Sequence, residues 1–192
     1  SRMDWAVELF GWFQYYLKDI GEEPAPMVQI QTHDGQWHVE ETWPPEDMDW
    51  QMETIGTEWE GSGTVNGLGS SVTLTSQVYE EGLHISGLPT LHLDVSTQAC
   101  NGGQIFATLY DHTLDLRLGH ATMDLRYRDG GYDANPVAPL SSYTMLMEFN
   151  PLDVIVPPGN SLRIELTEAS EDYLPGPCAT NPLGGLSIDG GS

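Results

Sequence analysis

The feature that most constrains the fold is an alternation of apolar and polar side chains within residues 88–128. In residues 91–96, leucine and valine share one face and polar side chains share the other, and residues 121–128 alternate in the same way. Residues 104–111, between them, are apolar on both faces. A period of two is typical of a half-buried strand, and a run that is apolar on both faces is typical of a central strand. Because short turns separate the three runs, they predict a meander whose apolar face needs a second layer.

Further short runs between turns supply that layer. Strands are expected at residues 27–32, 36–40, 72–78, 143–149, 162–167 and 186–188, with a short extended run at 154–160. Asp34-Gly35 marks the hairpin between the first two. Residues 46–70 are expected to form a long, irregular loop. Together with 21 glycines and 13 prolines, this spacing predicts an all-β, two-sheet antiparallel jelly-roll sandwich with one N-terminal helix.

The predicted helix covers residues 4–20, where Asp4 can cap it and Gly21 can end it. It is apolar over most of its circumference, so it should be covered on more than one side. One face is expected to pack on the sandwich, through Trp5, Leu9, Phe13 and Leu17. The outward residues, Phe10, Trp12 and Tyr15, predict a second partner surface, or self-association in its absence.

The net charge excludes two classes of partner. The chain has 29 acidic and 6 basic residues, for a formal net charge of −23. Such a surface repels nucleic acid and anionic membranes, and no apolar run is long enough to span a bilayer. The charge fits either an ordinary acidic domain or a protein from a high-salt environment, and the single lysine, Lys18, favours the second. The sequence does not distinguish a cytoplasmic from a secreted protein.

Sequence motifs for catalysis are absent. The sequence contains no G-x-S-x-G, H-E-x-x-H or P-loop pattern, and none of its six histidines has a serine or cysteine partner in a catalytic pattern. His33 and His38 flank the hairpin turn, where solvent exposure is a better explanation than metal binding. Loop carboxylates such as Asp111, Asp115 and Asp129 could bind calcium but lack EF-hand spacing. No cofactor or metal is therefore expected.

Three loop tryptophans and two cysteines leave alternatives open. Trp43, Trp50 and Trp59 could stack on a sugar, or they could pin long loops to the core. Cys100 and Cys178 match no zinc or redox spacing. They form either a disulfide or two free thiols.

Several motifs, in order along residues 5–190, resemble the C-terminal domain of the X-prolyl dipeptidyl aminopeptidase and cocaine esterase (CocE/NonD) family of serine hydrolases. They are Trp12-Phe13-Gln14-Tyr15-Tyr16-Leu17-Lys18, Val28-Gln29-Ile30 with Trp37 and Trp43-Pro44-Pro45, Ile85-Ser86-Gly87-Leu88-Pro89, Leu109-Tyr110-Asp111, Gly119-His120-Ala121, Leu125-Arg126-Tyr127-Arg128, and residues 156–164.

The resemblance implies a galactose-binding-like jelly roll, at residues 27–192, attached to a catalytic α/β-hydrolase domain of the same protein. Residues 1–21 would be the tail of that hydrolase domain, and the last strand would be incomplete at Ser192. The family's nucleophile, acid and histidine lie in the hydrolase domain, so no catalytic residue is assigned here. The expected interface residues are Trp5, Phe10, Trp12, Phe13, Tyr15 and Tyr16.

The expected function is therefore that of a non-catalytic accessory domain of an X-Pro dipeptidyl-peptidase-like or ester/amide serine hydrolase. It would support the hydrolase domain and its substrate pocket, and the chain alone is not expected to be catalytic. The alternative is a free-standing carbohydrate-binding module that uses the loop tryptophans.

Overall fold

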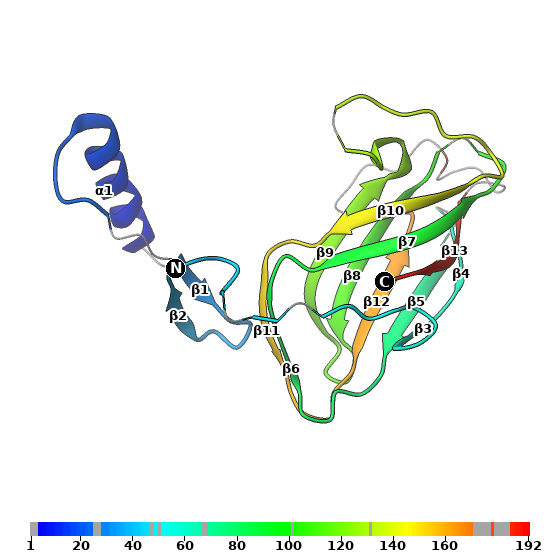
Figure 1. Ribbon diagram of the computed structural model, residues 1–192, viewed down its shortest axis with the longest axis horizontal. Coiled ribbons are helices and arrows are strands. Elements are labelled where there is room, and N and C mark those ends of the chain that lie inside the picture. Colours follow the sequence, from blue (N-terminus) through cyan, green and yellow to red (C-terminus); the bar gives the residue numbers. More distant parts are fainter. Residues whose placement is uncertain are drawn as a thin grey trace.

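The computed structural model describes residues 4–24, 28–46, 48–49, 51–66, 69–100, 102–130, 132–170, 178 and 185–192. Figure 1 shows two facing sheets, with a hairpin and a helix beyond one end of them. The elements at that end are α1 (Asp4–Lys18), β1 (Val28–Gln31) and β2 (Trp37–Glu40).

The first sheet has five antiparallel strands. Their spatial order is β3 (Trp59–Glu60), β5 (Ser71–Ser76), β12 (Leu162–Thr167), β8 (Gln104–Asp111) and β9 (Leu116–Asp124). As its two-sided apolar pattern predicts, β8 lies inside the sheet and is almost entirely buried. β12 alternates buried and half-buried residues along its whole length, as its sequence predicts.

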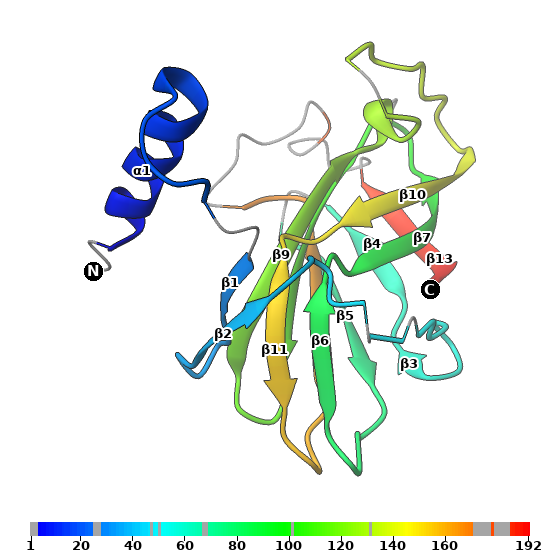
Figure 2. The same cartoon turned by 60° about the vertical axis from the view of Figure 1, so that its left-hand side comes forward.

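The second sheet has the order β10 (Ser142–Glu148), β7 (Thr90–Thr97), β13 (Leu186–Gly191) and β4 (Gly63–Val65). Below it, β6 (Leu83–Gly87) pairs with β11 (Leu152–Val156). Because β6 leads into β7 and β10 leads into β11, this pair continues the β7–β10 ladder past a break in both strands (Figure 2). Gly87 lies at the break with φ +133°, where a Cβ would come within 3.2 Å of Pro44.

The strand order is that of a jelly roll, which confirms the predicted fold class. β4 pairs with β13 and β7 with β10 in one sheet, while β5 pairs with β12 and β8 with β9 in the other. The predicted meander is wrong, however, because β7 and β8 belong to different sheets. The predicted 46–70 loop also contains two short strands, β3 and β4.

The third run of the predicted meander has different bounds in the structure. β9 begins at Leu116, inside the expected loop, and ends at Asp124. The chain then forms a 3-10 turn, η1 (Leu125–Tyr127), in which the Asp124 carboxylate accepts a hydrogen bond from the Arg126 backbone N–H. This cap ends the strand, although the alternation of the sequence continues to residue 128.

The core lies between the two sheets. Its fully enclosed side chains come from both layers, and include Leu74, Ile105 and Leu166 from one and Leu93, Val95 and Met145 from the other. Burying a side chain of this size stabilises the fold by about 1.5–3 kcal/mol. The sandwich therefore has a continuous core that does not include α1.

Helix α1 stands apart from the sandwich (Figures 1 and 2). The prediction that Trp5, Leu9, Phe13 and Leu17 pack on the sandwich is wrong, since these side chains are 43–72% exposed. The helix ends after Lys18, where Asp19 and Gly21 adopt positive φ angles.

Candidate functional site

The first candidate surface is the aromatic face of α1. Trp12 packs edge-on against Phe13, with ring centroids 5.3 Å apart, and lies 4.8 Å from the Tyr16 ring. Phe10 is 60% exposed and Trp5 is 55% exposed. The rings thus contact one another along the helix while their outer faces remain in water. Such rings combine a large apolar area with few rotatable bonds, as interface residues commonly do.

The hairpin also exposes apolar side chains. In β2, Trp37 and Val39 are 48% and 60% exposed, whereas His38 and Glu40 lie on the opposite, half-buried face. The helix meets the hairpin at Glu8, whose carboxylate accepts a hydrogen bond from Gln29 in β1 at 3.5 Å. Helix α1 and the β1–β2 hairpin, which we call the N-terminal unit, thus both expose apolar groups.

A cluster of two histidines and an aspartate joins this unit to the sandwich. Asp153 in β11 has a side chain that is only 1% exposed. His38 Nε2 contacts one of its carboxylate oxygens, and His84 Nε2, from β6, donates to the other at 2.7 Å. The second ring nitrogen of His38, Nδ1, lies 3.0 Å from a carboxylate oxygen of Glu40. We call His38, Asp153 and His84 the His–Asp–His junction.

The junction shifts the pKa values of two of its members. Burial raises the pKa of Asp153, but hydrogen bonds from His38 and His84 outweigh burial and hold that pKa below its usual value. The hydrogen bond to Asp153, followed by the one to Glu40, raises the pKa of His38 above its usual value. The junction therefore favours a charged carboxylate beside a charged imidazole.

A shallow cleft of about 340 Å³ runs beside the junction, between the hairpin and β11. Its lining is mainly apolar and includes Val28, Ile30, Trp43, Leu152 and Asp153. Trp43 is half-buried there. Two of the three tryptophans proposed to stack on a sugar, Trp43 and Trp59, lie among the described residues, and of these Trp43 is the one that lines a cleft.

Trp59 does not line that cleft. Trp59 is 9% exposed, and its indole Nε1 donates to Glu53 at 2.6 Å. The Tyr79 hydroxyl donates to the same carboxylate oxygen at 2.8 Å, and burial, followed by this bond, raises the pKa of Tyr79. This arrangement supports the alternative in which a tryptophan pins its loop to the core. Trp50 lies outside the described residues.

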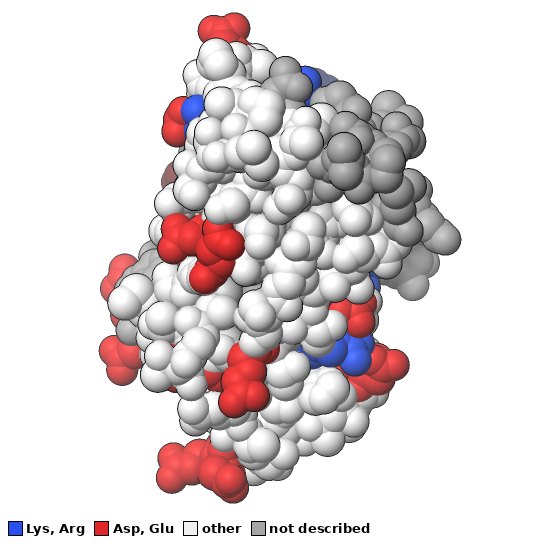
Figure 3. Space-filling view, turned by 90° about the vertical axis from the view of Figure 1, so that its right-hand side faces the viewer, with Lys and Arg blue, Asp and Glu red and all other residues white. Residues whose placement is uncertain are grey.

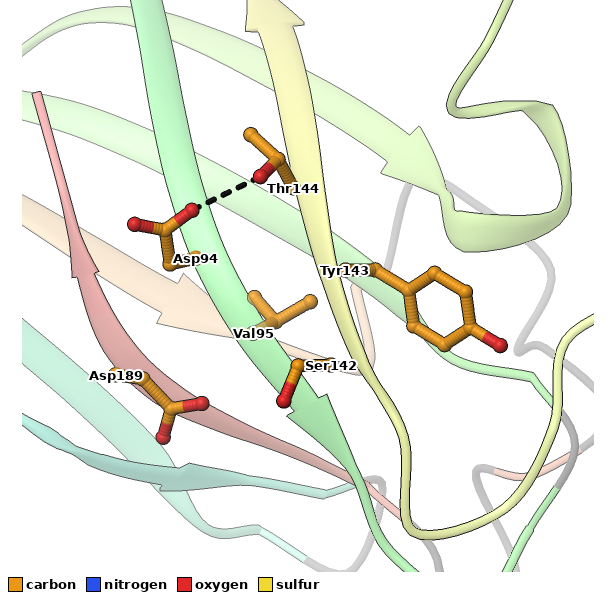
Figure 4. A pocket seen from close by; sticks show the side chains of 6 residues that line it. All are labelled: Asp94, Val95, Ser142, Tyr143, Thr144 and Asp189. Atoms are coloured by element: carbon orange, nitrogen blue, oxygen red, sulfur yellow. Dashed lines mark hydrogen bonds between the residues drawn. The ribbon is translucent and has the colours of Figure 1, made fainter.

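A second hollow, of about 370 Å³, lies on the outer face of the β10–β7–β13 sheet (Figure 4). Two carboxylates line it: Asp94 accepts from Thr144 at 2.9 Å, and Asp189 accepts from Ser96. Ser96 also contacts Ser142, at 3.1 Å. The hydroxyl groups on this face are thus engaged with neighbouring side chains.

Acidic groups are spread over the surface. On the face shown in Figure 3, red carboxylates occur in several separate groups and blue cationic groups are few. In the described part of the chain, no set of three or more His, Cys, Asp or Glu side chains could hold a metal ion. Among the same residues, no helix is long and apolar enough to cross a bilayer.

Cys100 and Cys178 form a disulfide, with their Cα atoms 6.1 Å apart. Cys178 is 2% exposed. The bond joins the segment after β7 to the segment before β13, and these two strands are neighbours in one sheet.

Sequence reasoning missed the His–Asp–His junction. His38 was expected to be an exposed turn residue, and Asp153 is 115 positions away from it. The local signal was the spacing of His38 and Glu40, which places both on the same face of a strand. That spacing identifies the pair but not the distant carboxylate.

Taken together, these features define a jelly-roll sandwich with an exposed aromatic N-terminal unit. A family model described as the X-Pro dipeptidyl-peptidase C-terminal non-catalytic domain matches residues 65–184, more than half of the chain. The chain therefore belongs to this family, which confirms the resemblance. No curated protein matches the sequence.

Several solved structures with the same fold are hydrolases. A CocE/NonD family hydrolase from Staphylococcus aureus aligns with a TM-score of 0.65 and 10% identity, over 97% of this chain and 42% of its own. An aminopeptidase from a marine-sediment Thaumarchaeota archaeon aligns with a TM-score of 0.65 and 14% identity, over 95% of this chain and 43% of its own. An α-amino acid ester hydrolase aligns with a TM-score of 0.58 and 14% identity, over 92% of this chain and 38% of its own. The chain thus spans about two fifths of the length of each of these structures.

Proposed function

We propose that this chain is the accessory domain of a larger serine hydrolase that acts on X-Pro peptides, esters or amides. The family match carries the proposal, because the matched family is described as non-catalytic and as the C-terminal part of a peptidase. The fold-level likeness to a CocE/NonD hydrolase and an α-amino acid ester hydrolase supports it. In such a protein the serine-ester chemistry would take place in the hydrolase domain.

The proposed partner surface is the aromatic face of α1. Its interface residues would be Trp5, Phe10, Trp12, Phe13, Tyr15 and Tyr16, five of which are 44–60% exposed and one of which, Tyr15, is half-buried. Contiguous apolar surface of this kind usually marks a binding site. Residues 1–21 would pack with the α/β-hydrolase domain, and residues 27–192 would form the domain that buttresses it and borders its substrate pocket.

Hydrolysis assays on the isolated chain test the first half of this proposal. With X-Pro chromogenic peptides and aryl esters, the chain should show no turnover above a heat-denatured control. Turnover that survives repurification and disappears with a serine-directed inhibitor would overturn the non-catalytic assignment.

The docking half is tested in the full-length protein that carries this domain. Replacing Phe10 and Trp12 with glutamine should lower kcat/KM and make the connection between the two domains easier to cleave with protease. Tyr132→Gln is the matched control, because that aromatic side chain is fully exposed at 102% and lies on a distant loop. Equal effects of the control and the double variant would refute docking through α1.

The carbohydrate-binding alternative has less support. Trp59 is committed to the core, so a platform of three tryptophans is not available. The galactose-binding-like type stays a prediction. We further propose a high-salt environment for the protein, on the basis of its net charge of −23.

A further inference from the structure

We infer that the His–Asp–His junction is a pH-sensitive latch that fixes the hairpin, and with it α1, to the sandwich. This inference does not rest on the proposed function, because the latch joins two parts of this chain. Its observations are the contacts of His38, Asp153 and His84 and their places on three different strands.

The geometry around His38 requires a charged ring. Its Nδ1 faces Glu40 and its Nε2 faces Asp153, so both nitrogens point at carboxylate oxygens. A neutral imidazole carries one N–H, whereas an imidazolium carries two. Losing the proton would therefore leave one ring lone pair facing a carboxylate. The two contacts can exist together only while His38 is protonated.

The residues that His38 contacts make the attachment of β2 depend on the protonation of its ring. Asp153 is almost fully buried, and its two oxygens are shared between β2 and β6. A buried carboxylate that loses a charged donor is costly to keep in place. The side chains of His38 and Glu40 are about one-third exposed, at 33% and 32%, so water can reach the opened site. Deprotonation therefore favours release of β2 from β11.

Few other groups on the described elements compete for this role. The rest of the neighbouring cleft is lined by uncharged residues. In β6, Ser86 lies beside Asp153 and adds to the lowering of its pKa. His33, in the hairpin turn, accepts a hydrogen bond from the Ile155 backbone N–H of β11 at 3.4 Å, so it is a second contact between the hairpin and the sandwich. The other titratable groups on these elements lie outside the junction: Asp34 in the hairpin turn, Glu41 after β2, and His120 in β9.

The sign of the effect follows from the two pKa directions. His38 is raised, so its contribution is complete below its usual pKa of about 6.5 and is lost as the pH rises through the raised value. Asp153 is lowered, so its contribution is present above its usual value of about 3.9 and is lost as the pH falls through the lowered value. The latch is thus closed below the usual pKa of His38 and opens as the pH rises through the raised pKa of that side chain.

Two measurements on the 192-residue chain test the latch. Ring ¹⁵N resonances should show His38 protonated on both nitrogens in mildly acidic solution. Amide hydrogen exchange in residues 28–40, corrected for its intrinsic pH dependence, should become about tenfold faster once His38 deprotonates, as expected for one lost hydrogen bond to a charged group. Exchange in β8 should not change, because it lies in the core.

Variants separate the latch from general unfolding. Asp153→Asn should lower the pKa of His38 and leave residues 28–40 in the faster-exchanging state at every pH. If that variant does not fold, His38→Gln serves instead, because the side chain is partly exposed and lies outside the core. His92→Gln is the matched control, an exposed histidine in β7, and should alter neither readout.

Two results would overturn the inference. One is a single ring proton on His38 throughout the range in which the latch should be closed. The other is corrected exchange in residues 28–40 that stays constant while His38 titrates. Either would show that protonation of His38 does not control how the hairpin is attached to the sandwich.

Discussion

The exposed aromatic side chains of α1 predict that the isolated chain associates with itself, and that two substitutions abolish the association. Phe10 is 60% exposed and Trp12 is 45% exposed. With about 150–250 Å² per aromatic side chain, the two leave roughly 200 Å² in water. At about 25 cal/mol per Å², burying this area in a dimer is worth up to about 5 kcal/mol per chain. Only part of this free energy appears as affinity, because association also costs translational and rotational freedom.

Phe10→Gln with Trp12→Gln should therefore weaken the dimer by at least about a hundredfold, or about 3 kcal/mol. The free energy of unfolding should change by no more than about 0.5 kcal/mol, because the replaced side chains are already in water. Glutamine also keeps a high helix propensity, so α1 itself should persist.

Sedimentation velocity and chemical denaturation measure the two quantities separately. Both measurements should be made in about 1 M salt. There the screening length falls to about 3 Å, and the net charge of −23 no longer opposes contact between chains. Tyr132→Gln should leave the dimer unchanged. A monomeric wild type, together with a double variant that loses more than about 2 kcal/mol of stability, would show that these side chains are core residues.

Three further predictions concern stability. The melting temperature should rise from dilute buffer into molar salt, since screening reduces repulsion among the acidic residues; a flat response would leave an ordinary acidic domain. Glu53→Ala should cost about 2–3 kcal/mol in thermal or chemical melts, because Trp59 and Tyr79 both lose their acceptor, while Glu53→Gln, which keeps one carbonyl, should cost less. Without reductant, alkylation followed by mass measurement should leave Cys100 and Cys178 unmodified, and reduction should cost up to about 4 kcal/mol.

The sequence predicted the position of a strand best where apolar and polar residues alternate strictly along it. Residues 162–167 alternate cleanly, and the structure has β12 at those positions. The period of two shows which face of a strand is buried, but it does not show which sheet the strand joins. The predicted meander failed for this reason, since β7 and β8 pair in different sheets.

Strand ends and short strands were harder to predict. β9 continues through a register shift opposite Leu109 and Tyr110, so Leu116 to His120 does not read as one continuous pattern. β3 has two residues and β4 has three, too few for any period to appear. The His–Asp–His junction depends on a tertiary contact between segments far apart in the chain, and no local pattern encodes it.

The disulfide makes a closed covalent ring of the chain between Cys100 and Cys178. That ring contains the exposed loop after η1, in which Tyr132 is fully accessible. A protease that cuts beside Tyr132 would sever the backbone yet leave both pieces joined through sulfur. β7 and β10, on opposite sides of such a cut, would also remain paired along their whole length. The nicked domain would migrate as one species until reductant is added, so a single proteolytic event in this loop need not separate the two halves of the sandwich.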